Sequence, residues 1–131
     1  RGLYTYVKRT SGFPGFLTFD APSRDVCSAR RIISNTPLQA LVTMNDPAHI
    51  EAAAALAEKM RQHSGELDAQ ISFAYLTITQ HQAGPHIIKE LVALYQDLKK
   101  ETPEAKGSMG TDPALTLTAN TILNLDAALT K

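Results

Sequence analysis

The chain has 131 residues, an average apolar content, no tryptophan, and thirteen basic residues against thirteen acidic residues. This length suits one domain with a single core, and the composition excludes a disordered or fibrous chain. The charge balance argues against a nucleic-acid-binding protein, because such domains are normally basic.

The sequence also limits the covalent and membrane chemistry of the chain. A single cysteine excludes an internal disulfide and a cysteine-based metal site. Since no run of 18 apolar residues is present, we expect no membrane insertion. The chain starts at Arg1 without a signal-peptide pattern, so we expect it to be part of a longer parent protein.

The charges are distributed unevenly. Residues 1–35 carry six basic and two acidic residues (6 − 2 = +4), and residues 36–131 carry seven and eleven (7 − 11 = −4). This asymmetry favours complementarity between two parts of one domain, and the alternative is an anion-binding face. We expect one domain over residues 1–131, with an aromatic and basic loop region of short helices first and a helical bundle from residue 36 onward.

The first predicted element is the end of a helix over residues 1–12, where apolar residues have helical spacing. Lys8 and Arg9 would lie in its last turn, where positive charge suits the helix dipole. Residues 13–19, FPGFLTF, predict an irregular loop because proline and glycine follow each other. We expect the three phenylalanines of this loop to insert into the core.

Residues 20–35 predict one short helix and contain the candidate polar site. In a helix, Arg24, Cys27 and Arg31 would share one face. Cys27 has two interpretations. A buried packing cysteine is favoured, because no histidine is near in sequence to act as a base, and the alternative is a thiolate stabilised by arginines that acts as a nucleophile or redox sensor. The candidate polar or anion-binding cluster comprises Asp20, Arg24, Cys27, Arg30, Arg31 and Asn35.

The clearest helix signals begin at Thr36. Thr36 as N-cap and Gln39 three residues later predict a capping box around a proline at the first helical position. Asp46 is predicted to cap a second helix over residues 47–63, which is rich in alanine and therefore suited to the centre of a bundle. The apolar face of the first of these helices comprises Leu38, Leu41 and Val42.

Three further helices are predicted. Apolar residues recur at helical spacing over residues 67–78 and 86–100, and Asp112 is predicted to cap a helix over residues 113–129. Residues 101–111 are rich in glycine, proline and charge and predict a surface loop. Since strand candidates are almost absent, the fold class is all-α, an irregular helical bundle of about five helices with a long N-terminal loop region.

Familiar catalytic and ligand patterns are missing. The four histidines do not match a zinc, metalloprotease or haem-attachment spacing, and His81 and His86 are read as a surface pair beside a turn. Phosphate-binding glycine loops and hydrolase nucleophile motifs are absent. Asp20, Asp25 and Asp46 could form an acid and base pair, but caps and ion pairs account for each. We expect no metal or cofactor in this chain.

The segment TFDAPSRDVCSARRIISNTPLQALVTMNDP resembles the planctomycete-type PSD-one domain, a domain of unknown function. LYTYVKRT before it and LTANTILNLDAALTK at the end extend the resemblance, whereas QHQAGP and Ile32 to Ser34 depart from the more basic family pattern. The resemblance implies the C-terminal part of a longer domain in a large exported, periplasmic bacterial protein that commonly carries a cytochrome-c-like segment. It implies no established activity or catalytic residue.

These observations favour a non-catalytic helical module, structural or interacting, whose partners are other domains of the same parent protein. The alternative is the C-terminal part of an enzyme or anion-binding domain with its site in the Asp20 to Asn35 segment. A third hypothesis places haem elsewhere in the parent protein, with His49 or Met44 contacting the cytochrome segment.

Overall fold

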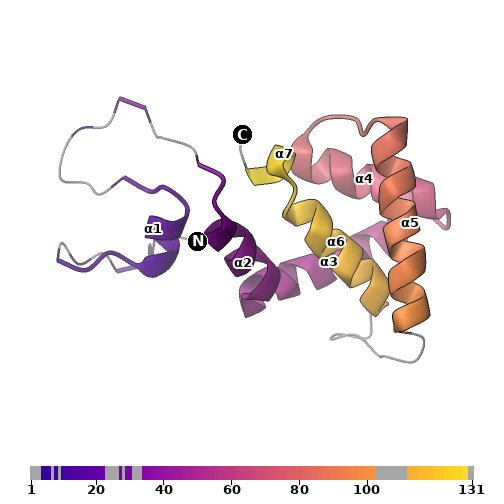
Figure 1. Cartoon of the computed structure of the whole chain (residues 1–131), viewed down its shortest axis with the longest axis horizontal. Helices are drawn as coiled ribbons and strands as arrows, with labels where there is room; N and C mark the ends of the chain where they lie inside the picture. Colours follow the sequence, from indigo (N-terminus) through magenta and orange to yellow (C-terminus); the bar gives the residue numbers. More distant parts are fainter. Residues whose placement is uncertain are drawn as a thin grey trace.

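The computed structural model describes residues 4–6, 8, 10–22, 27, 29–30, 34–102 and 112–129, and Figure 1 shows helices joined by loops. These residues form no strand, so the predicted all-α class is confirmed, and the five longer helices α2 to α6 match the predicted number. The helices are α1 (Pro14–Thr18), α2 (Pro37–Asn45), α3 (Pro47–His63), α4 (Leu67–Thr79), α5 (Pro85–Glu101), α6 (Pro113–Leu123) and α7 (Asp126–Leu129).

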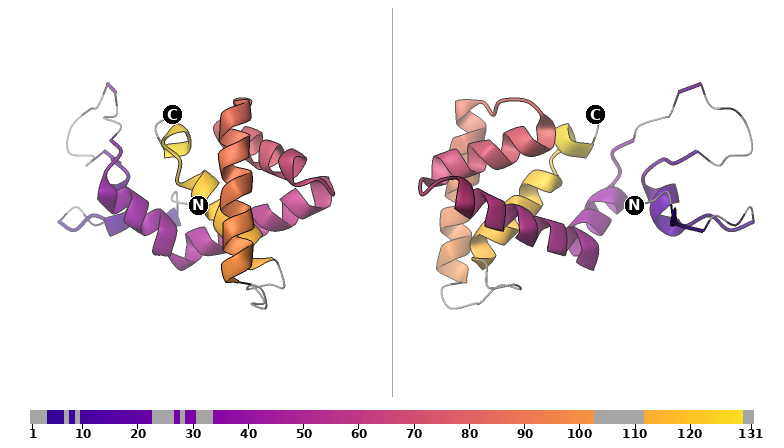
Figure 2. Two further views of the ribbon diagram at one scale, coloured as in Figure 1. Left: turned by 45° about the vertical axis from the view of Figure 1, so that its right-hand side comes forward. Right: turned by 180° about the vertical axis from the view of Figure 1, so that it is seen from behind.

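Helices α3 and α6 form the centre of the bundle. Helix α3 packs against α2, α4 and α6, and α6 also contacts α4 and α5. Figure 2 shows from two further sides that α1 lies at the end of the molecule beyond α2. The alanines of α3 allow this close approach, as the sequence predicts. Side chains that are fully or almost fully buried in the core include Ala53, Ala57, Met60, Ile71, Ala74, Leu115, Ala119 and Ile122.

Two of the helix starts are built as their sequences predict. The Asp46 carboxylate accepts a hydrogen bond from the backbone N–H of Ala48 (2.8 Å), and the Asp112 carboxylate accepts one from the N–H of Ala114 (3.0 Å). Each aspartate is followed by a proline at the first helical position. The caps satisfy backbone donors that have no partner inside the helix, and they fix where α3 and α6 begin.

The predicted helix over residues 113–129 is two helices, so its predicted end is wrong. The Asn124 N–H is shared between the carbonyls of Asn120 and Thr121 (both 3.1 Å), and the Leu125 N–H bonds to the Ile122 carbonyl (3.3 Å). Bonds that span three residues tighten the final turn and break the α-helical ladder. The chain then restarts as the short helix α7.

The predicted helix end over residues 1–12 is wrong for the described part of that range. Residues 4–6 are not α-helical, and Lys8 and Ser11 form an isolated antiparallel bridge. The Ser11 N–H donates to the Lys8 carbonyl at 3.1 Å, which closes a tight turn in place of a helical last turn. Arg9 lies outside the described residues.

The predicted loop over residues 13–19 contains helix α1, which begins at Pro14. The backbone N–H of the first helical residue has no partner inside the helix, so a proline, which has no N–H, is tolerated there. Pro14, which was expected to break regular structure, therefore starts a helix. Phe13 is 50% exposed and packs edge to face on Phe16, with ring centroids 5.3 Å apart. The prediction that these phenylalanines insert into the core is therefore wrong: Phe16 and Phe19 are only partly buried, and none of the three belongs to the core cluster.

Residues 20–35 were predicted to form one short helix, and none of the described residues in this range is helical. The Asp20 backbone has φ 55, a left-handed conformation that ends regular structure directly after α1. Residues 103–111, most of the predicted surface loop, lie outside the described residues.

A hydrogen-bonded tyrosine ties α5 to the start of α6. The Tyr95 hydroxyl donates to the Asp112 carboxylate (2.8 Å), and the Lys99 ammonium donates to the Tyr95 oxygen (3.2 Å). Burial raises the pKa of Tyr95, and the hydrogen bond to Asp112 acts in the same direction, against the opposing effect of Lys99.

This contact makes stability sensitive to alkaline pH. Because the folded chain holds the Tyr95 proton more tightly than the unfolded chain does, its contribution is complete below the ordinary pKa of 10.0 and is lost as pH rises through the folded value. We expect the urea midpoint to fall less in Tyr95→Phe than in the natural chain between about pH 8 and pH 11. Equal decreases in both chains would contradict this role of Tyr95.

Candidate functional site

The side chain of Gln39, at the start of α2, is the centre of a polar network. It is only 2% exposed. Its Nε2 donates to the Thr18 carbonyl (2.8 Å) and lies within hydrogen-bond distance of Asp20 Oδ2 (3.3 Å) and Ser34 Oγ (3.2 Å). Its Oε1 accepts from the Thr36 N–H (2.9 Å). We call Thr18, Asp20, Ser34, Thr36 and Gln39 the Gln39 network.

The capping box predicted from the sequence is part of this network. The Thr36 hydroxyl accepts from the Gln39 N–H (3.3 Å), while the Gln39 side chain accepts from the Thr36 N–H. A capping box usually serves only its own helix. Here the same glutamine also reaches the carbonyl of Thr18, at the end of α1, so that one side chain fixes both the start of α2 and the segment before it.

Asp20 has a structural role in the network. Its Oδ2 accepts from the N–H (2.8 Å) and hydroxyl (2.7 Å) of Ser34, in addition to its contact with Gln39. Short hydrogen bonds to a carboxylate are stronger than those between neutral groups, and they hold two loop segments together. The structure therefore uses this carboxylate as an acceptor for the chain itself.

The other members of the predicted cluster take part in different contacts. Asn35 Nδ2 donates to Asp126 Oδ1 (2.7 Å), which connects the entry of α2 to α7. Cys27 and Arg30 are exposed. The structure thus brings Asp20 to Ser34 and Gln39, and Asn35 to Asp126. Arg24 and Arg31 lie outside the described residues.

Cys27 does not have the buried packing position that the sequence favoured. The prediction assumed a helix whose covered face would carry the thiol, and none of the described residues around Cys27 is helical. Without that face the side chain is exposed to solvent. A thiol alone supplies no site, because catalysis by cysteine needs a positioned base or stabilising charge.

His49 and Met44 occupy different environments. The His49 ring stacks on Phe19 (centroids 6.2 Å apart, 28° between planes), and its buried Nδ1 lies 3.8 Å from Asp46 Oδ1. Met44 is 53% exposed. His49, in the first turn of α3, therefore packs against Phe19 of the N-terminal segment, and its contact with haem stays a prediction. Within the described ranges, no three His, Cys, Asp or Glu side chains are placed to hold a metal ion.

Helix α2 exposes two residues of its predicted apolar face, Leu38 and Leu41, whereas the third, Val42, is partly buried. It buries Gln39 and Thr43, and Leu38 and Leu41 are 56% and 59% exposed. The Thr43 hydroxyl donates to Asn124 Oδ1 (2.7 Å) beside α6. Since successive residues turn by about 100°, the buried pair and the exposed leucines lie on opposite sides of the helix.

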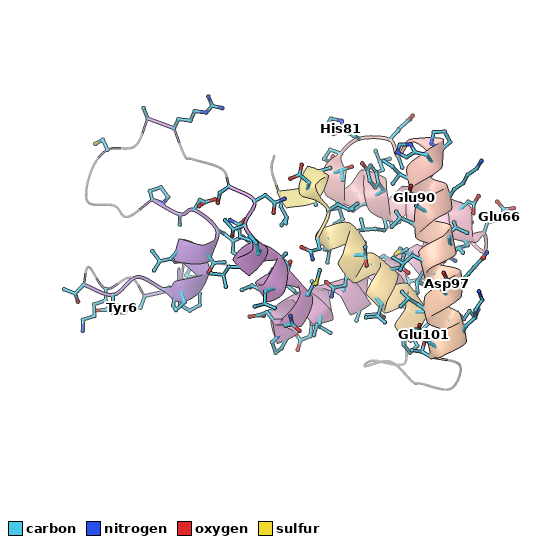
Figure 3. The ribbon with its side chains drawn as sticks, in the orientation of Figure 1. Tyr6, Glu66, His81, Glu90, Asp97 and Glu101 are labelled. Carbon is cyan, nitrogen blue, oxygen red and sulfur yellow. The ribbon has the colours of Figure 1, made fainter. Side chains whose placement is uncertain are left out.

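We call Leu38, Leu41 and Met44 the α2 apolar face. These residues succeed one another at intervals of three and are all more than half exposed. The sequence of α2, PLQALVTMN, contains no charged residue. Figure 3 shows that the labelled acidic side chains Glu90, Asp97 and Glu101 lie along α5, away from α2. The α2 apolar face therefore lacks the charges that normally cover an exposed helix.

Sequence reasoning missed the orientation of α2. The sequence feature that could have revealed this orientation is the spacing of Gln39 and Thr43, which places two polar side chains on one face of a short helix. A polar stripe on a helix is normally read as the solvated side. Only partners outside the helix, the Thr18 backbone carbonyl and the side chains of Ser34 and Asn124, make burial of that stripe favourable.

Comparison with known proteins identifies a family of unknown function. A family model described as "PSD1: Protein of unknown function (DUF1553)" matches residues 1–95. The matched range contains the Gln39 network, the α2 apolar face and helices α1 to α4. No curated protein and no solved structure was found to match the chain. No helix among the described residues is long and apolar enough to cross a membrane.

Proposed function

The chain belongs to the PSD1 family of unknown function, and we propose that it acts as a non-catalytic interaction module of a larger protein. The observation that carries this proposal is the inverted orientation of α2, with polar residues buried and the α2 apolar face exposed. An uncovered apolar helix face loses the stabilisation that burial would give. A partner surface that covers Leu38, Leu41 and Met44 restores it.

The Gln39 network supports the proposal by fixing how α2 is presented. Gln39 holds the N-terminal end of α2 to the Thr18 carbonyl, and Thr43 holds its other end to Asn124. Both attachments use the polar side of the helix. They leave the α2 apolar face outward and rigidly placed, which lowers the entropy that docking would cost.

The proposed partner is an apolar helix face from another domain of the same parent protein. The absence of charge on α2 favours an uncharged surface over a basic or acidic one. An intramolecular partner has a high effective concentration, so a small apolar face suffices for stable docking. Export of the parent protein, a periplasmic location and a cytochrome-c-like segment are further proposals that rest on the family resemblance.

Leu41→Glu tests the docking. The variant places a charge at the middle of the α2 apolar face without removing a buried contact, since Leu41 is 59% exposed. We expect its binding to the purified remainder of the parent protein, measured by calorimetry, to weaken at least about 100-fold, because burying an unpaired charge costs several kcal/mol. Stability of the isolated chain should change by less than about 0.5 kcal/mol.

Ala93→Glu is the matched control, since it adds the same charge at an exposed position of α5. We expect it to bind like the natural chain. Equal binding by Leu41→Glu and Ala93→Glu would show that α2 is not the docking surface.

Anion binding by the N-terminal segment is the second candidate function. The observation that favours it is the exposure of Arg30 within a range that carries six basic and two acidic residues. Titration with sulfate and phosphate at low salt decides between the candidates. Saturable binding that Arg30→Gln removes would support an anion site. If no saturable binding is found, the anion site is excluded and the interaction module is favoured.

A further inference from the structure

A cleft of about 450 Å³ opens to solvent beside the C-terminal end of α3, and none of its lining residues belongs to the Gln39 network. Its apolar lining comes from Ala69, Phe73 and Leu76 on α4 and from Ala83 in the turn before α5. The small side chains of Ala69 and Ala83 keep the cleft open, and Leu76, which also lines it, is 46% exposed. The volume lies in the range of small-molecule sites.

One wall of the cleft is aromatic. The rings of His63 and Phe73 stack nearly parallel, with centroids 4.2 Å apart and 15° between their planes. Phe73 also packs against the hydrophobic core, so its ring is held in place before any ligand arrives. A flat ring entering the cleft would find a fixed aromatic surface, against which offset stacking or edge contacts are favourable.

Apart from the His63 imidazole, the polar side chains that line the cleft are neutral hydrogen-bonding groups. Ser72 donates its hydroxyl proton to the Asp68 carbonyl (2.7 Å), so its remaining capacity is that of an acceptor. The Gln82 carboxamide offers both an acceptor and donors. Among the described residues, no Asp, Glu, Lys or Arg lines this cleft. An anionic ligand would therefore lose hydration without gaining an ion pair from a lysine or arginine of the cleft.

We propose that this cleft binds a neutral aromatic ring that carries an O–H or N–H donor, such as a phenol or an indole. The stacked His63 and Phe73 rings supply the surface, Ala69 and Ala83 leave the room, and Ser72 and Gln82 accept the donor. The ring belongs either to a free small molecule or to an aromatic side chain of a partner protein, since both present the same chemistry. This inference is independent of the docking proposed for α2.

The test is a titration of the 131-residue chain with indole, followed by backbone amide NMR shifts. We expect saturable binding in the millimolar range, the usual strength for so small a ligand, with shifts confined to residues around the cleft. Benzoate, of similar size but charged, should bind at least about tenfold more weakly. No saturable shift with indole, or equal binding of benzoate, would overturn the proposal.

Ala69→Leu fills the cleft with a side chain that suits a helix, and we expect it to weaken indole binding at least about tenfold. Ala52→Leu makes the same change at an exposed position of α3 and should bind as the natural chain does. Gln82→Leu, in an exposed turn, removes the amide without touching the core and should weaken binding about threefold. Unchanged binding in both cleft variants would overturn the site.

A capped amino acid distinguishes the two sources of the ring. N-acetyltryptophanamide carries the indole on a peptide-like backbone. Binding as tight as that of free indole would support the site and identify a partner's side chain, and tenfold weaker binding would support the site and identify a free small molecule. Failure of both ligands to bind would overturn the proposal.

Discussion

Replacing Gln39 by alanine should lower the free energy of unfolding by about 2–3 kcal/mol, a large effect for a side chain at a helix start. The variant removes the hydrogen bonds to the Thr18 carbonyl and the Thr36 N–H, and it leaves the partly buried Ser34 hydroxyl and Asp20 carboxylate one partner short. Buried polar groups without partners carry the full cost of lost hydration. Urea unfolding followed by circular dichroism measures the change.

The same variant should also release the N-terminal segment from α2. Limited proteolysis is expected to cleave residues 13–22 faster in Gln39→Ala than in the natural chain, because α1 loses its tie to α2. Gln96→Ala, at an exposed position of α5, is the matched control and should change neither property. A loss in Gln39→Ala no larger than that in Gln96→Ala would contradict the structural role of the network.

Met60→Ala should destabilise the chain by about 2–4 kcal/mol. Met60 is completely buried and belongs to the core cluster shared by α3, α4, α5 and α6. Truncation leaves a cavity among side chains that are fixed by four helices, so the core can collapse only partly. The free energy of unfolding from urea titration is the measurement.

Met44→Ala makes the identical change on the α2 apolar face, where the side chain is 53% exposed. We expect a change within about 0.5 kcal/mol in the isolated chain, because little buried surface is lost. Similar losses in both methionine variants would contradict the described core. The contrast also distinguishes residues that stabilise this chain from residues of the proposed docking surface.

Local signals made much of the fold predictable. Thr36, Asp46 and Asp112 begin helices because each cap satisfies donors only two or three residues away, so a short stretch of sequence contains the whole interaction. The apolar spacing of α4 and α5 likewise reports their buried sides. These features predict the existence and the starts of the five longer helices, while the predicted end of the last of them is wrong.

The arrangement of the N-terminal region and α2 could not be predicted from the sequence, because it depends on contacts between residues that are far apart in the chain. Gln39 looks like a cap, and its second role depends on Thr18, 21 residues earlier, and on Ser34. The burial of Thr43 depends on Asn124, 81 residues later. No pattern within α2 encodes these partners. The periodicity showed correctly that Leu38 and Leu41 share a face, but it could not show which side the bundle would cover.

The candidate site shows the same limit. Asp20 and Asn35 were predicted as polar site residues from their density in one segment, and the structure gives each of them an internal partner, Ser34 and Asp126. Residue type alone does not distinguish a carboxylate that binds a ligand from one that binds its own chain. The aromatic cleft was missed because His63 and Phe73 meet only when α3 and α4 pack.

We propose that α2 is held by its polar side and presents its apolar face to another domain. Hydrogen–deuterium exchange of the chain, alone and joined to the remainder of the proposed parent protein, tests this claim. We predict slower exchange over Pro37–Asn45 in the joined protein and unchanged exchange over Pro85–Glu101, because docking at α2 suppresses its local opening. Equal exchange of α2 in both proteins would contradict the claim.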